Sequence, residues 1–242
     1  MLVPKIKELD TIVPIDVTWI LECLDEKFDD AISLLPNSCL IYGGAIRDLL
    51  AGLPIGGDLD IAVPHMEYNA LRQVFGDSVR WVAKPGNILL PKDYNRPSAK
   101  IISGITTYTN TTGDEIQLIQ ACPNEKSMAV SNQLIYNLGV VEIVTNVDLV
   151  CSAVMMDMQG NVFEVLPNAL KDCKNRILTF NEELKPKEIY KETIIKRIQK
   201  LEKRGWVSHV DTTKFKNNSK LVRNKKGDVT TERIFFKTKP NF

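Results

Sequence analysis

Residues 42–63, which read YGGAIRDLLAGLPIGGDLDIAV, are the part of the sequence that is most informative about the fold. The apolar run Cys39–Tyr42 leads into it and predicts a short strand. The pair Gly43-Gly44 interrupts that strand, because glycine permits a sharp turn and lets an anion approach main-chain N–H groups. Residues 45–51 then predict a helix that ends at Gly52. A strand, a glycine turn and a helix N-terminus together predict a phosphate-binding site.

Two aspartates follow on the next predicted strand. Side chains two residues apart in a strand share a face, so Asp58 and Asp60 point one way while Leu59 and Ile61 point to a core. Neighbouring carboxylates repel each other, and a divalent cation removes that repulsion. Oxygen ligands of this kind suit Mg²⁺ or Mn²⁺ rather than zinc. With Arg47 adding a forked positive charge, the stretch predicts phosphoryl or nucleotidyl transfer.

The ordered combination of the glycine pair, Arg47 and the Asp58–Asp60 pair resembles the head domain of bacterial-type CCA-adding enzymes and poly(A) polymerases. These enzymes belong to the polymerase-β nucleotidyltransferase superfamily. The resemblance implies an α/β (α+β) head with a mixed sheet flanked by helices. It also implies that Asp58 and Asp60 are catalytic metal ligands, and that Gly43, Gly44 and Arg47 bind the triphosphate of an NTP. The alternative, a turn, a surface helix and an acidic strand end, leaves the two same-face aspartates unexplained.

Residues 146–165 resemble the second motif of this family, in which two arginines precede Asp-Phe-Thr-x-Asn-Ala. Asp148 aligns with the Asp of that motif and Ser152 with its Asn, which implies that both lie near the sugar of the nucleotide. Asn146 and Val147 stand in place of the two arginines, so the chain departs from the family at its usual triphosphate contacts. Residues 168–178 resemble the segment that closes the family's head domain.

Glu115 is the candidate for a third metal-binding carboxylate. It begins a predicted strand over residues 115–121, in which Glu115 and Gln117 share one face. The superfamily often places a carboxylate on a strand near this point. The alternative for Glu115 is the solvated face of an edge strand.

Apolar spacing predicts further elements on either side of these motifs. It predicts one helix over residues 17–35, another over 66–75 and a weaker one over 125–138. A β-branched apolar run predicts a strand over residues 140–144.

Charge is distributed unevenly along the 242 residues, although the net charge is only +1. From Lys185 onward there are 17 Lys and Arg against 6 Asp and Glu, about +11, which leaves 14 basic and 24 acidic residues, about −10, in the rest. We therefore divide the chain into a head, residues 1–180, and a neck-like helix with a basic extension, residues 181–242. A basic extension predicts a nucleic-acid partner, here an RNA acceptor, with a solvated tail as the alternative.

The neck-like helix is predicted from Pro186 to about Arg204, with an apolar stripe and a basic side. In the family, a helix at this place carries nucleotide-selecting side chains, a role that Arg197 and Arg204 match loosely. Simple packing on the head with solvated lysines is the alternative.

The composition of the chain bears on its cellular compartment and on membrane association. The five cysteines are scattered and show no CxxC spacing, which predicts reduced thiols and a cytoplasmic protein. No apolar run approaches a membrane span of about 20 residues, so no membrane partner is expected.

Three functions remain open at this point. The first is a metal-dependent transfer of a nucleoside monophosphate from an NTP to a hydroxyl. The second is a degenerate head that binds nucleotide or RNA without chemistry, which the missing arginine pair favours. The third is transfer onto a protein side chain.

Overall fold

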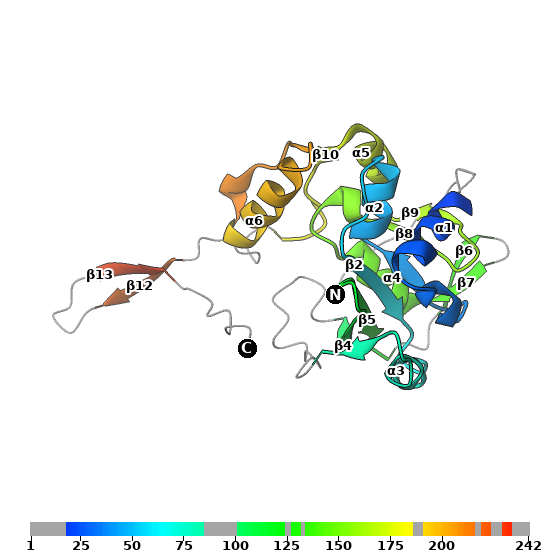
Figure 1. Ribbon diagram of the computed structural model, residues 1–242. Coiled ribbons are helices and arrows are strands. Elements are labelled where there is room, and N and C mark those ends of the chain that lie inside the picture. Colours follow the sequence, from blue (N-terminus) through cyan, green and yellow to red (C-terminus); the bar gives the residue numbers. More distant parts are fainter. Residues whose placement is uncertain are drawn as a thin grey trace.

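The computed structural model describes residues 18–84, 101–123, 127–131, 134–185, 191–215, 219–223 and 229–233. Its centre is a seven-stranded sheet with the order β3-β4-β5-β2-β1-β8-β9 (Figure 1). The strands are β1 (Leu40–Tyr42), β2 (Asp58–Val63), β3 (Val82–Ala83), β4 (Ile102–Thr109), β5 (Glu115–Ala121), β8 (Val154–Met156) and β9 (Val162–Glu164). β2 and β5 are parallel, and the other neighbouring pairs are antiparallel. The predicted mixed sheet is confirmed.

Helices flank this sheet, as predicted. α4 packs against β2 and β5, whereas α2 packs against β1, β2 and β8. Figure 1 shows α2, α5 and α6 gathered at one end of the molecule. The α-helices are α1 (Thr18–Lys27), α2 (Gly44–Leu50), α3 (Tyr68–Gly76), α4 (Leu138–Thr145), α5 (Ala169–Asn175) and α6 (Lys191–Glu202), and the short 3₁₀ helices are η1 (Ala31–Leu34), η4 (Val150–Ser152) and η6 (Thr212–Lys214).

The centre of the sheet shows the alternation that the sequence predicts for β2. Leu59 and Ile61 are fully buried in the core, whereas Asp58 is exposed and Asp60 is partly exposed. Burying an aliphatic side chain of this size contributes roughly 1.5–3 kcal/mol. The register of the strand is therefore set by its apolar face, and the two aspartates are carried to the opposite face.

The predicted helix over residues 17–35 is wrong in one respect, because the chain breaks after α1. Asp29 and Asp30 both have positive φ, 48° and 60°, and they lead into η1. Asp tolerates this left-handed conformation better than most residues. Asn110 Nδ2 also donates to Asp29 Oδ2 at 2.8 Å. Ile20, Leu24 and Phe28 before the break, and Ala31, Ile32 and Leu35 after it, are nevertheless buried as predicted.

Two neighbouring predictions are also wrong. Residues 125–138, predicted as a weak helix, contain the antiparallel strands β6 (Ser127–Ser131) and β7 (Leu134–Asn137). Residues 140–144, predicted as a strand, belong to α4. Val140, Val141 and Val144 are fully buried there. Packing against β2 and β5 outweighs the weak preference of β-branched residues for strands.

The chain beyond α6 returns to the sheet-containing body. β11 (Val207–Ser208) pairs in parallel with β10 (Ile177–Leu178). Trp206 and Phe215 are 3% and 6% exposed, and the Phe215 ring packs edge-on against Phe180 at 4.8 Å between centroids. The described chain is therefore packed together as far as Phe215.

A separate antiparallel ribbon follows, formed by β12 (Ser219–Arg223) and β13 (Val229–Arg233). Figure 1 draws this ribbon apart from the seven-stranded sheet. Within the described residues, no helix is both long enough and apolar enough to cross a membrane.

Candidate active site

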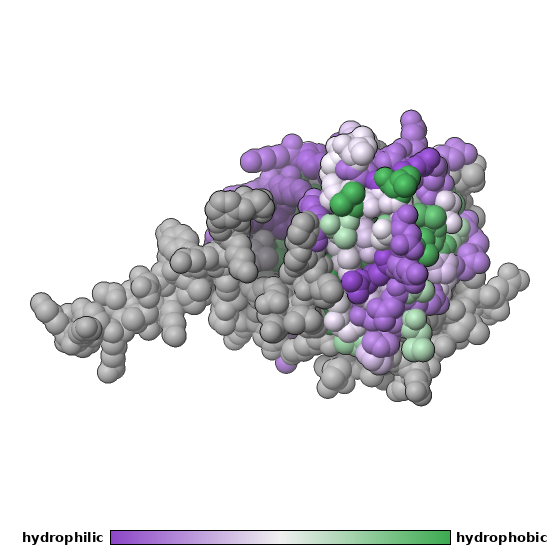
Figure 2. Space-filling view, turned by 60° about the horizontal axis from the view of Figure 1, so that its bottom comes forward, coloured by the Kyte–Doolittle hydropathy of each residue, from purple (hydrophilic) through white to green (hydrophobic). Residues whose placement is uncertain are grey.

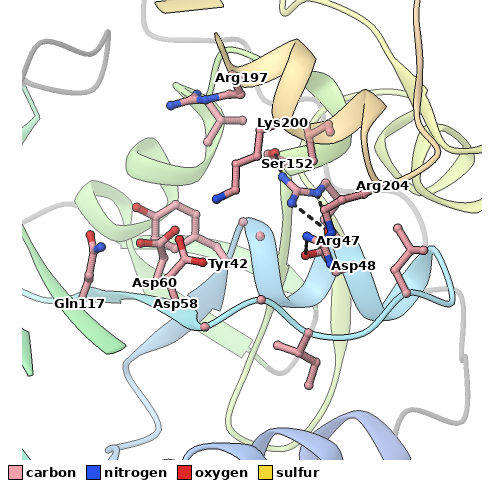
Figure 3. Close-up of a pocket in the computed structure, with 18 of the residues that line it drawn as sticks. Tyr42, Arg47, Asp48, Asp58, Asp60, Gln117, Ser152, Arg197, Lys200 and Arg204 are labelled. Carbon is pink, nitrogen blue, oxygen red and sulfur yellow. Dashed lines mark hydrogen bonds and ion pairs between the residues drawn. The ribbon is translucent and has the colours of Figure 1, made fainter. Parts of the chain in front are cut away.

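A cavity of about 680 Å³ lies where the sheet meets α6 (Figure 3). This volume is within the range of pockets that bind small molecules and cofactors. Its wall consists of the start of α2, the start of β2, the end of α4, the segment around η4 and one face of α6. The lining residues are Tyr42, Gly43, Gly44, Arg47, Asp48, Leu53, Pro54, Ile55, Gly56, Gly57, Asp58, Asp60, Gln117, Ile143, Asn146, Val147, Asp148, Ser152, Arg197, Lys200, Leu201 and Arg204.

The glycine turn after β1 shapes the floor of this cavity. Gly43 has φ 77° and ψ −129°, a conformation that costs energy for any residue with a Cβ atom. A Cβ atom at Gly43 would also lie 3.3 Å from Asp60 Oδ2. The turn therefore needs glycine for two reasons, its backbone conformation and its close approach to a carboxylate.

Asp58 and Asp60 lie side by side and face the cavity, with Gln117 and Tyr42 beside them (Figure 3). Tyr42 on β1 and Gln117 on β5 are the cross-strand partners of Asp60. Two carboxylates and neutral oxygens suit Mg²⁺, which is often held by one or two carboxylates together with substrate phosphates. Within the described part of the chain, no group of three or more His, Cys, Asp or Glu side chains could hold a metal. The donor set therefore fits an ion whose coordination is completed by substrate and water.

Glu115 lies opposite Asp58 in the register of the parallel pair β2–β5. Its carboxylate forms an ion pair with Lys84, and it does not belong to the cavity wall. Gln117, two residues later on the same face, takes the place beside Asp60 instead. The neutral neighbour of the predicted third carboxylate is therefore the residue that the structure brings to the cavity.

Arg47 is held in the cavity wall by its neighbours. Its Nε and Nη2 atoms donate to Asp48 Oδ1 at 3.0 and 2.8 Å, and its Nη1 atom donates to Ser152 Oγ at 3.2 Å. The guanidinium also lies 5.6 Å from the centre of the Trp206 ring. A guanidinium has five N–H donors, so these three bonds leave it with donors to spare. Arg47 is thus both a structural group and a cavity residue.

α6 and the turn that follows it, which contains Arg204, close the opposite side of the cavity. Arg197 forms an ion pair with the buried carboxylate of Asp148. Arg204 Nη1 donates to Asp48 Oδ2 at 2.5 Å, and its Nη2 donates to the Pro54 carbonyl at 2.6 Å. The side chain of Lys200 lies between these two arginines along the helix (Figure 3).

The contribution of α6 could have been read only in part from the sequence. Residues 197, 200 and 204 recur at the spacing of one helical face, beside the buried stripe of Ile194, Ile198 and Leu201. That spacing indicates a basic stripe, but it does not say whether the stripe meets water or a cavity. No comparable pattern in the sequence indicates the role of Asp48, which binds both Arg47 and Arg204.

A search of the solved structures matched CCA-adding enzymes. The Thermotoga maritima CCA-adding enzyme complexed with tRNA matches at 16% sequence identity and a TM-score of 0.51, over 80% of this chain and 42% of that one. The chain has a polymerase-β-type nucleotidyltransferase fold. At this identity the likeness shows the fold alone.

Two further structures match this nucleotidyltransferase fold with lower scores. A CCA-adding enzyme in complex with CTP matches at 15% identity and a TM-score of 0.49, over 80% of this chain and 43% of that one. The Bacillus stearothermophilus CCA-adding enzyme with CTP matches at 17% identity and a TM-score of 0.47, over 77% and 42%. The chain thus spans less than half the length of these enzymes. No protein-family model matches the sequence, and a search of the curated proteins gave no significant match.

Within this nucleotidyltransferase fold, most of the predicted site residues converge on one cavity. Its wall includes Gly43, Gly44, Arg47, Asp58, Asp60, Asp148 and Ser152. Glu115 is the predicted site residue that lies outside the wall. The structure thus brings together two motifs that are about ninety residues apart in the sequence.

Proposed function

We propose that this chain is a metal-dependent nucleotidyltransferase that moves a nucleoside monophosphate from an NTP to a hydroxyl group on RNA. The observation that carries the proposal is the pair Asp58 and Asp60, placed side by side in a nucleotide-sized cavity next to the Gly43 turn. The fold supports a transferase of this class. The Thermotoga enzyme was solved in complex with tRNA, which supports RNA as the acceptor.

The charges of the cavity support a requirement for a metal ion. Its wall contains four cationic side chains, Arg47, Arg197, Lys200 and Arg204, and four aspartates, among them Asp58 and Asp60. The protein groups therefore offer no excess positive charge to a triphosphate. Asp58 and Asp60 would hold Mg²⁺ or Mn²⁺, which when bound promotes ionisation of the attacking hydroxyl and neutralises charge on the departing pyrophosphate.

The chain's own residues would position the nucleotide. The turn at Gly43 and Gly44 would let phosphates approach the floor of the cavity, and Arg47 would offer them the N–H donors that Asp48 and Ser152 do not use. Asp148 and Ser152 would lie near the sugar. α6 covers the site and limits the access of water, which strengthens the electrostatic interactions inside. Glu115 would serve as a third ligand only after releasing Lys84.

The proposal is tested by incubating the protein with each labelled NTP, Mg²⁺ and total RNA. We expect label in RNA, no label when EDTA is present, and a loss of at least about a hundredfold in Asp60→Asn. Asp77→Asn is the matched control, because Asp77 is an exposed carboxylate at the end of α3 and outside the cavity. Equal incorporation by wild type and Asp60→Asn would contradict the assignment.

Two observations favour a second candidate, a nucleotide-binding module without catalysis. Gln117 lies beside Asp60 where a carboxylate could stand, and Asn146 and Val147 line the cavity without positive charge. This candidate predicts Mg²⁺-dependent NTP binding with no label in any acceptor. Transfer onto a protein side chain would instead put the label into protein. The same assay, with RNA and protein fractions separated, distinguishes the three functions.

A further inference from the structure

One cation of the cavity differs from the other three in its partners. Arg47 and Arg204 both bind Asp48, and Arg197 binds Asp148. Lys200 forms no ion pair with any of the described residues. Three of the four positive charges are thus paired with protein carboxylates, and among the described residues Lys200 has no such ion-pair partner.

The direction of Lys200 follows from the packing of α6. Ile194, Ile198 and Leu201 are buried, which fixes the rotation of the helix against the body. Residue 200 then lies on the cavity-facing side, between Arg197 and Arg204. Figure 3 shows its amino group extending into the cavity toward Asp58 and Asp60, with Arg47 on the other side of the space.

The site also lacks positive charge where the second motif lines it. Asn146 and Val147 form part of the wall and carry no charge. A triphosphate beside the Asp58–Asp60 pair needs cationic contacts that are not already occupied by protein carboxylates. Of the cationic side chains in the wall, Lys200 meets that condition.

We propose that the Lys200 amino group binds the triphosphate of the incoming NTP. This inference rests on the proposed function and adds a nucleotide-positioning residue to it. A lysine suits this role, since its flexible stem and compact charge can follow a phosphate without a planar partner. Affinity for NTP then depends on α6, a segment about 140 residues beyond the carboxylate pair, rather than on the sheet alone.

The test is a titration of the full chain with Mg²⁺–NTP and with the matching nucleoside monophosphate. We expect Lys200→Gln to raise the Kd for NTP about tenfold or more, because a hydrogen bond to a charged group is lost. The Kd for the monophosphate should stay within about twofold, and Lys200→Arg should restore most of the NTP affinity.

Lys196→Gln is the matched control, one helical turn earlier on the same helix. Lys196 is 72% exposed, pairs with Glu192 at 2.8 Å and does not line the cavity, so its substitution should leave the Kd unchanged. Equal losses in Lys196→Gln and Lys200→Gln would indicate a general charge effect and overturn the inference. If wild type binds NTP and Lys200→Gln binds it equally well, the inference fails and the proposed function stands. If wild type binds no NTP, the proposed function itself fails.

Discussion

Asp60 lies where β1, β2, β5 and the Gly43 turn come together. It pairs across the sheet with Tyr42 and Gln117, and its Oδ2 atom lies close to the backbone of Gly43. We therefore expect a substitution at Asp60 to affect mainly the binding of Mg²⁺ and NTP, and a substitution at Gly43 to affect mainly the stability of the fold.

Asp60→Asn should abolish the stabilisation that Mg²⁺ and NTP give to the folded protein. A ligand that binds only the native state raises the melting temperature, and the rise grows with the logarithm of the ligand concentration divided by its Kd. We expect wild type to show a clear increase in Tm with Mg²⁺ and NTP, and Asp60→Asn to show almost none. Without ligand the two proteins should melt at similar temperatures, since Asp60 is not part of the apolar core. A large loss of Tm without ligand would indicate a structural role for this carboxylate.

Gly43→Ala should destabilise the protein through its backbone. The positive φ of Gly43 and the 3.3 Å approach to Asp60 both oppose a Cβ atom. We expect a loss of about 1–3 kcal/mol in the free energy of unfolding, measured with urea. The control is Gly76→Ala, because Gly76 ends α3 without a positive φ and a Cβ atom there would meet nothing within 4 Å. Equal stability of both variants would contradict the strain at Gly43.

The buried thiol of Cys151 should make stability depend on pH under alkaline conditions. Burial raises the pKa of Cys151 to about 12, whereas the pKa of a cysteine thiol in an unfolded chain is about 8.5. The native state therefore keeps a proton that the unfolded state loses, and stability falls as pH rises above about 8.5, by up to about 1.4 kcal/mol per pH unit.

Urea unfolding at pH 8, 9 and 10 measures this slope. Cys151→Ala should make the slope shallower, whatever its effect on stability at pH 8. The thiol of Cys173 donates to the Cys151 carbonyl at 3.1 Å, a contact that the substitution leaves in place. An unchanged slope would show that other groups account for the alkaline loss.

At the scale of the elements, α6 is joined to the body by charge as well as by apolar contact. Arg204 binds both Asp48 of α2 and the Pro54 carbonyl of the loop before β2. Asp48 is 1% exposed and accepts hydrogen bonds from two arginines. The end of α6 and the turn after it are thus tied both to α2 and to the loop that leads to the carboxylate pair.

Arg204→Ala should weaken this junction. Removing one partner leaves a buried carboxylate with less compensation, which costs several kcal/mol in fully buried pairs. Since the Arg204 side chain is 26% exposed, we expect a smaller loss of about 1–2 kcal/mol and a higher Kd for NTP. Lys203→Ala is the control, because Lys203 is exposed on the neighbouring position of the same turn. Similar unfolding curves for both variants would show that the apolar stripe alone holds α6.

At the scale of the whole molecule, the basic C-terminal part divides at Phe215. Residues up to Phe215 pack against the body through Trp206, β11 and the Phe180–Phe215 contact. Residues 216–242 contain eight Lys and Arg against two Asp and Glu. A polyanion would be attracted mainly by this second portion.

Truncation after Phe215 should therefore reduce RNA affinity without affecting NTP binding. Each lost phosphate contact lowers the slope of log K against log salt by about 0.7–0.9, so the slope should become shallower. Truncation after Arg204 is the contrasting variant, because it removes the buried Trp206 and Phe215 and should destabilise the fold. If the protein cut after Phe215 binds RNA as tightly as the full chain at every salt concentration, residues 216–242 are a solvated tail.

Much of the site could be read from residues 42–63 because the rules that apply there are local. A glycine pair sets a turn, and a period of two places Asp58 and Asp60 on one face with Leu59 and Ile61 on the other. The apolar spacing of residues 17–35 likewise identified buried positions, although it missed the two left-handed aspartates that divide the helix. Turns and faces depend on near neighbours, which the sequence contains.

The features that the sequence did not predict depend on contacts between residues that are distant along the chain. Residues 140–144 look like a strand alone, but they form α4 because they pack across β2 and β5. Gln117 rather than Glu115 lines the cavity, because the register of β2 and β5 places Gln117 beside Asp60, while Glu115 pairs with Lys84. Lys200 lines the same cavity as Asp58 and Asp60 because α6 docks on the body through its buried apolar stripe. The free energy of such packing comes from contacts between segments that are far apart in the sequence. It therefore cannot be predicted from the periodicity of one segment.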